Sequence, residues 1–181
     1  MALKATIYKA NVNVADMDRN VYMDETLTIA RHPSETAQRM MLRVLAWVLN
    51  ADEHISFTKG LSADDEPELW IKNYSNEIEL WIDLGMPDEK RLKKACGRSK
   101  QVLLYVYGDR ASSVWWQQNQ QKLSQLSNLT VVSIEDDSLA ELTAFEDRAM
   151  NLQFSLQDGQ VWLTADSGSC CITPVTLQGV E

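Results

Sequence analysis

Residues 63–94 read ADDEPELWIKNYSNEIELWIDLGMPDEKRLKK, and the rest of the chain is organised around this stretch. Two short runs in it, Glu68–Lys72 and Glu77–Leu84, have the apolar or alternating character of strands, and each carries an acidic residue at one end. A turn follows, and then a helix rich in Lys and Arg, Asp88–Lys100. The stretch therefore predicts carboxylates at the ends of neighbouring strands, with amines close by.

The segments on either side complete an α/β (α+β) layout. Strands are expected at Leu3–Val14, Val21–Arg31, His54–Lys59, Gln101–Tyr107, Leu129–Ile134, Asn151–Gln157, Gln160–Ala165 and Cys170–Leu177, and helices from His32 to about Ala51, at Val114–Leu126 and at Asp136–Asp147. We expect one domain over residues 1–181. Its core, about residues 32–147, is expected to be a mixed sheet flanked by helices, with an additional sheet formed by the hairpin 3–31 and the strands 150–178.

Composition narrows the class of protein. The chain has 181 residues, of which 45% are hydrophobic and 24% charged, and no apolar run approaches the ~18 residues of a membrane span. The opening residues alternate between polar and apolar and contain no signal-peptide core. The three cysteines, Cys96, Cys170 and Cys171, form no disulfide framework, which favours a reducing cytoplasm. The two histidines have no Cys or His partner at ligand spacing, which argues against the usual zinc site.

The net charge of −9 also bears on partners. Proteins that coat nucleic acid over a long surface are usually basic. An acidic chain can offer only a local basic patch, so composition weighs against a nucleic-acid coat and less against an enzyme that touches a few phosphates.

The element order resembles the PD-(D/E)xK nuclease-like fold, because a helix, three strands, a helix and a strand succeed one another. Acids stand at Glu35 on the first helix, at Glu68 after a proline, and at Asp83 on the third strand. In that superfamily the corresponding acids hold one or two Mg²⁺ ions, which prefer carboxylate oxygen. The bound metal then activates a water molecule and shields the scissile phosphate. The resemblance implies Mg²⁺, or Mn²⁺, as the cofactor, with Glu68 and Asp83 as metal ligands.

One position departs from that pattern. The D/E-x-K motif ends in a lysine that orients or deprotonates water, but the corresponding residue here is Gly85. The nearest amines stand on the following helix at Lys90, Lys93 and Lys94. A catalytic amine would therefore have to come from a neighbouring element.

Longer segments resemble the bacterial YaeQ family. They are MALKATIYKANVNVADMDRN at the start, ARHPSETAQRMMLRVLAWVLNA (30–51), FTKGLSADDEPELW (57–70), IELWIDLGMPDEKRLKKAC (78–96) and VWWQQNQ (114–120). That family is known for a variant of the PD-(D/E)xK fold, which implies the fold rather than an activity. Carried over by position, the resemblance implies Glu68 and Asp83 as the acidic pair, Glu35 as the third acid, and the Lys90–Lys94 segment as the source of the amine.

Each of these residues also has an ordinary structural interpretation. Glu35 would be an acid in the first turn of a helix that Ser34 caps, facing the positive end of the helix dipole, and Lys90, Lys93 and Lys94 would be a solvated helix face. Residues 64–66 would be a solvated acidic loop. The pair Trp115-Trp116 could stack on bases, or one ring could lie in the core.

Three functions remain open at this point. The first is a Mg²⁺- or Mn²⁺-dependent nuclease acting on nucleic acid, with Lys94 or Lys90 activating water. The second is a catalytically inactive module on the same scaffold that binds a nucleic acid or a protein. The third is an adaptor that uses its C-terminal strands as the contact surface.

Overall fold

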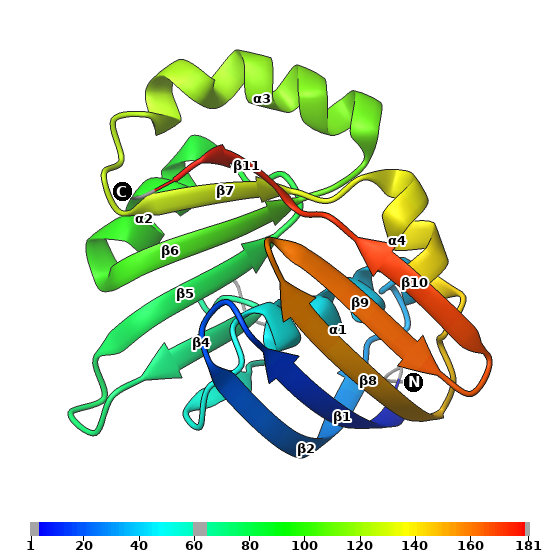
Figure 1. Cartoon of the computed structure of the whole chain (residues 1–181). Helices are drawn as coiled ribbons and strands as arrows, with labels where there is room; N and C mark the ends of the chain where they lie inside the picture. Colours follow the sequence, from blue (N-terminus) through cyan, green and yellow to red (C-terminus); the bar gives the residue numbers. More distant parts are fainter. Residues whose placement is uncertain (1–3, 60–64, 180–181) are drawn as a thin grey trace. The chain divides into compact units, whose positions relative to one another are not determined.

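The computed structural model describes residues 4–59 and 65–179, which form a mixed α+β fold (Figure 1). Within these residues the chain has two mixed β-sheets and four helices. The fold divides into two compact units, the first within residues 1–52 and 137–173 and the second within residues 53–136 and 174–181. No helix in the described ranges has the length and apolar character that a membrane crossing requires.

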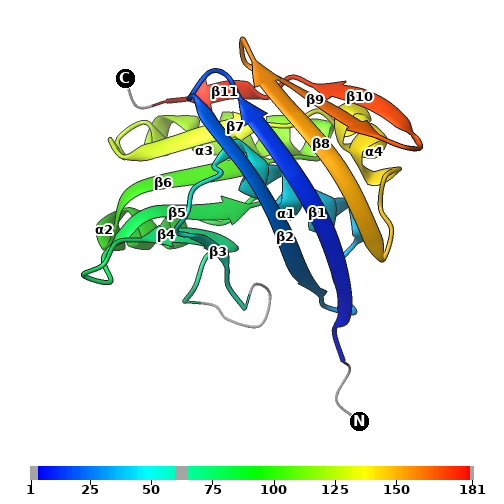
Figure 2. The ribbon, with the colours of Figure 1, turned by 60° about the horizontal axis from the view of Figure 1, so that its bottom comes forward.

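The first unit contains a five-stranded sheet in the order β10-β9-β8-β1-β2 (Figure 2). Its strands are β1 (Thr6–Asp16), β2 (Val21–Arg31), β8 (Ala149–Gln157), β9 (Gln160–Ala165) and β10 (Gly168–Ile172). Only the β1–β8 pair is parallel. Along β1 the residues Tyr8, Ala10, Val12 and Val14 are buried, while the residues between them are more exposed, as expected of a sheet with one covered face.

The strands expected at Asn151–Gln157 and Gln160–Ala165 form a hairpin, in which Asp158 and Gly159 both have positive φ and join β8 to β9. The last predicted strand, Cys170–Leu177, is wrong as a single element. The chain leaves the first sheet after β10 and resumes as β11 (Val175–Gln178), which pairs with β7 of the second sheet. Pro174 lies at the break, where a residue without an N–H cannot continue the ladder.

Helix α1 (Ala37–Leu49) begins later than the sequence predicted. Thr36 is its N-cap and accepts a hydrogen bond from the Arg39 N–H at 3.1 Å, whereas Ser34 contacts the ring of His32. Every residue from Met40 to Val48 is buried. The cap was misplaced because two hydroxyl residues lie two positions apart, and either one could serve. Helix α4 (Asp136–Thr143) is shorter than expected and buries Leu139 and Leu142.

The second unit contains a six-stranded sheet in the order β11-β7-β6-β5-β4-β3. Its three central strands, β5 (Ile78–Leu84), β6 (Ser99–Val106) and β7 (Leu129–Ser133), are parallel, while β3 (Ile55–Phe57), β4 (Leu69–Lys72) and β11 are antiparallel to their neighbours. Helices α2 (Glu89–Arg98) and α3 (Asp109–Leu123) make the two crossovers. Trp81, Leu92, Leu104 and Leu123 belong to the core cluster that joins both helices to the sheet.

Helix α3 starts five residues before its predicted start at Val114. The reason is a cap from another element, because the Asp136 carboxylate accepts from the N–H groups of Gly108 and Asp109 at 2.8 and 3.0 Å. The Asp109 carboxylate in turn accepts a hydrogen bond from the Asp136 N–H at 2.9 Å. This cap comes from 27 residues away along the chain, so the local sequence at the helix start does not show it.

Candidate functional site

Asp83 lies at the C-terminal end of β5 and is buried. Arg91 holds both of its carboxylate oxygens, with Nε donating to Oδ2 at 2.9 Å and Nη2 to Oδ1 at 3.1 Å. Such a two-point ion pair is among the stronger and more directional contacts in proteins. The pair therefore fixes the end of β5 to the first turn of α2.

Local structure explains why Arg91 reaches Asp83. Asp88 caps α2 and accepts from the Arg91 N–H at 2.8 Å, which sets where the first turn begins. Arg91 lies four residues before the buried Ala95, so it is on the side of the helix that faces the sheet. Its Nη2 also donates to the Glu66 carbonyl at 2.9 Å, and this bond links α2 to the segment before β4.

Glu68, the second predicted acid, is also buried. Its N–H donates to the Ile82 carbonyl at 2.9 Å, and its carbonyl accepts from the Thr58 N–H at 3.2 Å. The β4–β5 register pairs Leu69 with Ile82, so one pair further Glu68 stands opposite Asp83. The backbones of the two predicted acids are therefore neighbours on adjacent strands.

Glu35, the third predicted acid, lies in the first unit, just before the N-cap of α1. Its buried carboxylate pairs with Arg39 at 3.1 Å and with the buried Arg43 at 2.5 Å. The Glu35 carbonyl accepts from Arg31 Nε at 3.0 Å. Glu35 and Arg39 thus form an i,i+4 ion pair, while the predicted placement of Glu35 inside the first helical turn is wrong, because the helix begins after it.

The predicted amines, Lys90, Lys93 and Lys94, are all exposed on α2. The cation beside Asp83 is Arg91, which sequence reasoning missed because it sought a lysine. The available signal was the spacing of four between Arg91 and Ala95, which the apolar residues of the helix already defined as inward.

Gly85 occupies the position at which the nuclease motif has its lysine. Its φ is +95°, in the left-handed region, and its N–H donates to the Tyr105 carbonyl at 2.8 Å. The backbone leaves the strand at this point in a conformation that favours glycine. A lysine there would be strained even though the space around the Cβ position is open.

A Mg²⁺ ion at Glu68 and Asp83 would need carboxylate oxygens that are free to coordinate it. Both oxygens of Asp83 already accept from a guanidinium, whose positive charge opposes a cation. Among residues 4–59 and 65–179, no group of three or more His, Cys, Asp or Glu side chains could hold a metal ion. In this arrangement a metal ion at Asp83 would have to displace the Arg91 guanidinium.

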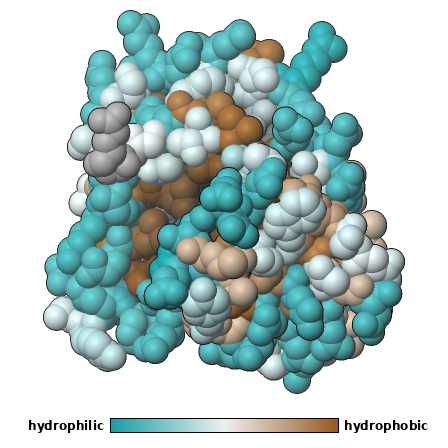
Figure 3. All heavy atoms as spheres, in the orientation of Figure 1, coloured by the Kyte–Doolittle hydropathy of each residue, from teal (hydrophilic) through white to brown (hydrophobic). Residues whose placement is uncertain are grey.

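A basic surface lies on the same unit. Residues 85–124 contain eight Lys or Arg and three Asp or Glu, although the whole chain has a net charge of −9. On α2 the side chains of Lys90, Lys93, Lys94 and Arg98 are exposed. Helix α3, which packs beside α2, adds exposed glutamines, and Figure 3 shows mostly polar side chains along α3 at the top of the view. We call this the α2–α3 surface.

The two tryptophans of α3 are both half-buried, with ring centroids 6.4 Å apart. Trp115 donates from Nε1 to the Pro87 carbonyl at 3.2 Å, so it anchors the loop before α2. Its polar atom is thus used within the protein, which favours the structural interpretation for Trp115 over the stacking one.

Several known proteins that are similar to this chain are named YaeQ. The family model described as "YaeQ protein" matches residues 1–174. A protein named "Uncharacterized protein YaeQ" from Escherichia coli (strain K12) is 57% identical over 169 residues, which is 93% of each chain. The crystal structure of the YaeQ protein from Xanthomonas axonopodis pv. citri has a TM-score of 0.94 and 42% identity, and covers 97% of this chain and 99% of that one. The YaeQ structure from Pseudomonas syringae has a TM-score of 0.92 and 34% identity, with 97% of both chains covered.

Proposed function

The chain belongs to the YaeQ family, and we propose that it is a nuclease-like module that binds nucleic acid through the α2–α3 surface without cleaving it. The observation that carries this proposal is the two-point pair between Arg91 and Asp83. The pair occupies Asp83, one of the two buried acids that a nuclease of this type would use to hold metal.

The nuclease-like origin rests on element order and sheet topology. The second unit joins the antiparallel strands β3, β4 and β5 to the parallel pair β5–β6 through α2, and Glu68 and Asp83 stand at adjacent strand ends. We therefore regard it as a variant of the PD-(D/E)xK fold. Fold alone does not establish chemistry, so the argument for binding rests on charge.

The α2–α3 surface supplies that charge. Exposed lysines contact phosphate oxygens without reading sequence. Lys90, Lys93 and Lys94 stand within two turns of one helix, and exposed glutamines on α3 add hydrogen-bonding groups beside them. Because the rest of the chain is strongly acidic, binding would be confined to this surface and would weaken steeply with salt.

A second candidate is the Mg²⁺- or Mn²⁺-dependent phosphodiesterase that the sequence predicted. The burial of two neighbouring acids, Glu68 and Asp83, favours it. In this case Arg91 would have to release Asp83, and Lys90 or Lys94 would supply the amine.

The experiment measures binding and cleavage together, on labelled single-stranded DNA, duplex DNA and RNA, with Mg²⁺ or Mn²⁺. The double variant Lys93→Gln/Lys94→Gln is compared with Lys4→Gln/Lys9→Gln, which removes the same charge from the first unit. On duplex DNA the first variant is expected to reduce the slope of log K against log salt by about 2, because two phosphate contacts are lost.

Cleavage decides between the two candidates. The proposal expects none from the wild type with either metal. Metal-dependent cleavage by the wild type that disappears in Asp83→Asn would establish the phosphodiesterase and refute the non-catalytic role. Cleavage that persists in Asp83→Asn would indicate a contaminating nuclease.

A further inference from the structure

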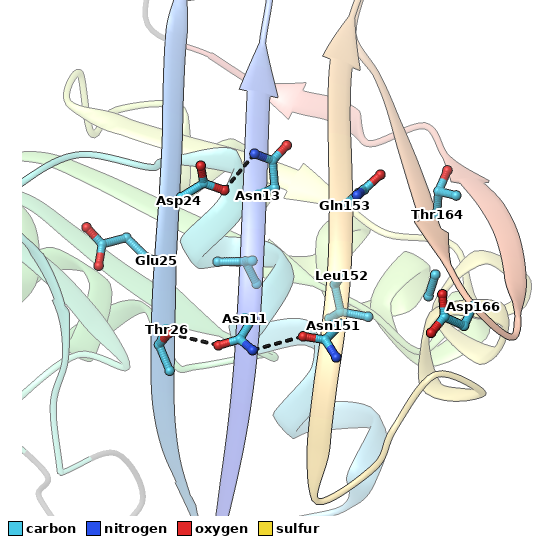
Figure 4. Close-up of a pocket in the computed structure, with 12 residues that line it drawn as sticks. Asn11, Asn13, Asp24, Glu25, Thr26, Asn151, Leu152, Gln153, Thr164 and Asp166 are labelled. Carbon is cyan, nitrogen blue, oxygen red and sulfur yellow. Dashed lines mark hydrogen bonds between the residues drawn. The ribbon is translucent and has the colours of Figure 1, made fainter.

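The outer face of the first-unit sheet carries an open polar pocket of about 430 Å³. Figure 4 shows side chains from β1, β2, β8 and β9 around it. Those with hydrogen-bonding groups include Asn11, Asn13, Asp24, Thr26, Asn151, Gln153 and Thr164. On β1 and β8 they alternate with buried apolar residues, so the pocket lies on the face of the sheet opposite the core.

Cross-strand hydrogen bonds hold these side chains in place. Thr26 Oγ1 donates to Asn11 Oδ1, and Asn11 Nδ2 donates to Asn151 Oδ1, each at 2.8 Å. In the neighbouring row, Asn13 Nδ2 donates to Asp24 Oδ1 at 2.7 Å. Each amide has two N–H groups and two lone pairs, so these bonds use only part of its capacity. The remaining donors and acceptors stand in fixed directions on an open face.

Two exposed aromatic rings lie beside these polar side chains. Tyr22 is 62% exposed and Trp162 is 49% exposed. The strand registers place them in one row, Tyr22–Ala15–Ser155–Trp162, with small residues between the rings. This row is two residues along the strands from the row that contains Asn13, about 7 Å away, and the rings are three strand spacings apart, about 14 Å.

The charge of the face restricts the ligand. Asp24, Glu25 and Asp166 line the pocket, and no Lys or Arg is among its lining residues. Phosphate and other polyanions are therefore disfavoured here, in contrast to the α2–α3 surface. The ligand class that fits this face has many hydroxyl groups, which can bond to the amides and carboxylates, and apolar faces, which can cover the aromatic rings.

We propose that this face binds an oligosaccharide without acidic groups. Sugar hydroxyls donate to Asp24 and to the amide oxygens and accept from the amide N–H groups, while the C–H faces of the sugar rings cover Trp162 and Tyr22. Because three carboxylates surround the pocket, amino sugars bind more tightly than neutral ones at low salt. This inference is independent of nucleic-acid binding, since it uses residues of the other unit.

The test follows the Trp162 indole N–H signal by NMR, assigned by its absence in Trp162→Ala. The full chain is titrated with α-1,4 and β-1,4 glucose oligomers, with a glucosamine oligomer, and with a galacturonate oligomer as the acidic comparison. We expect saturable shifts with at least one glucose oligomer, tighter binding of the glucosamine oligomer, and no response to galacturonate. Calorimetric titration, which does not depend on the Trp162 signal, is expected to show binding weakened about tenfold in Trp162→Ala and weakened in Gln153→Ala as well.

The matched control is Tyr74→Ala, which removes an aromatic ring that is 94% exposed in the second unit. It is expected to leave sugar binding unchanged. No binding of any glucose or glucosamine oligomer would overturn the proposal. So would equal binding by wild type, Trp162→Ala and Gln153→Ala, or galacturonate binding as tight as that of glucosamine. Trp162 and Gln153 are exposed, and circular dichroism checks that both variants fold.

Discussion

Replacing Arg91 with alanine is expected to lower the free energy of unfolding of the chain by about 2–4 kcal/mol. The substitution removes both hydrogen bonds to Asp83 and the bond to the Glu66 carbonyl. It leaves the Asp83 carboxylate, whose side chain is only 3% exposed, buried without its guanidinium.

The size of this loss follows from leaving one charged partner of the pair buried after the other has been removed. Breaking a fully buried ion pair from one side costs about 3–5 kcal/mol. The Arg91 side chain is 32% exposed, so water can partly replace it, which lowers this cost to about 1–3 kcal/mol. The lost bond to Glu66 adds about 1 kcal/mol. Asp83→Asn is milder, at about 1 kcal/mol, because the amide keeps an oxygen for Arg91 and removes the buried charge.

Urea unfolding followed by tryptophan fluorescence measures these changes, since Trp70, Trp81, Trp115 and Trp116 lie in the second unit. Lys94→Ala, an exposed residue of the same helix, is the control and is expected to change stability by less than about 0.5 kcal/mol. The decisive variant is Arg91→Ala/Asp83→Asn, which is expected to be more stable than Arg91→Ala alone. A double variant no more stable than Arg91→Ala would refute the reasoning, because the penalty would then not come from a buried, unpaired carboxylate.

Four other predictions each concern a single residue. Glu35→Ala is expected to cost about 3 kcal/mol in urea unfolding, because two arginines lose their carboxylate. Hydrogen bonds from the N–H groups of Asp158 and Gly159 lower the pKa of Asp18 in the folded state. Asp18→Ala is therefore expected to reduce Tm at pH values above 3.8. This reduction is expected to disappear as the pH falls through the lowered pKa of the folded state, because the carboxylate is then protonated. Burial raises the pKa of the Cys96 thiol to about 11, so mass spectrometry is expected to show slow alkylation at pH 8 that rises about tenfold per pH unit. Gly85→Lys is expected to cost about 1–2 kcal/mol in unfolding because of its positive φ, with no gain in cleavage.

Patterns that repeat along the chain were predictable. The strands expected at Leu3–Val14, Val21–Arg31 and Gln101–Tyr107 are present as β1, β2 and β6, and the YaeQ resemblance is confirmed by the family model and by close relatives. The acids Glu68 and Asp83 were expected on adjacent strands, and the β4–β5 register brings their backbones together. These features depend on residues near one another in sequence, or on a period that a single strand displays.

The features that were missed depend on contacts between distant elements. The start of α3 is set by Asp136, which no local rule connects to Gly108. The break at Pro174 separates β10 from β11, and β11 pairs with β7 of the other sheet. Nothing in the local sequence indicates with which sheet the residues after Pro174 pair. The cation at Asp83 was sought among lysines, because a motif gives a residue type and not the helical phase that decides which side chain faces the sheet.

Arg91 and the lysine of a D/E-x-K strand are not equivalent in chemistry, although both place a positive charge beside the acid. A lysine amine is a compact charge that can give up a proton when its surroundings favour it, and so it can assist in activating water. A guanidinium stays protonated, and its fork holds both oxygens of one carboxylate. Gly85 turns the chain out of the strand with positive φ, and the helix that follows presents Arg91 to Asp83. At this position the chain therefore has a structural partner for the acid, where the motif has a proton-transfer group, and this difference supports the proposal of a module that holds nucleic acid without cutting it.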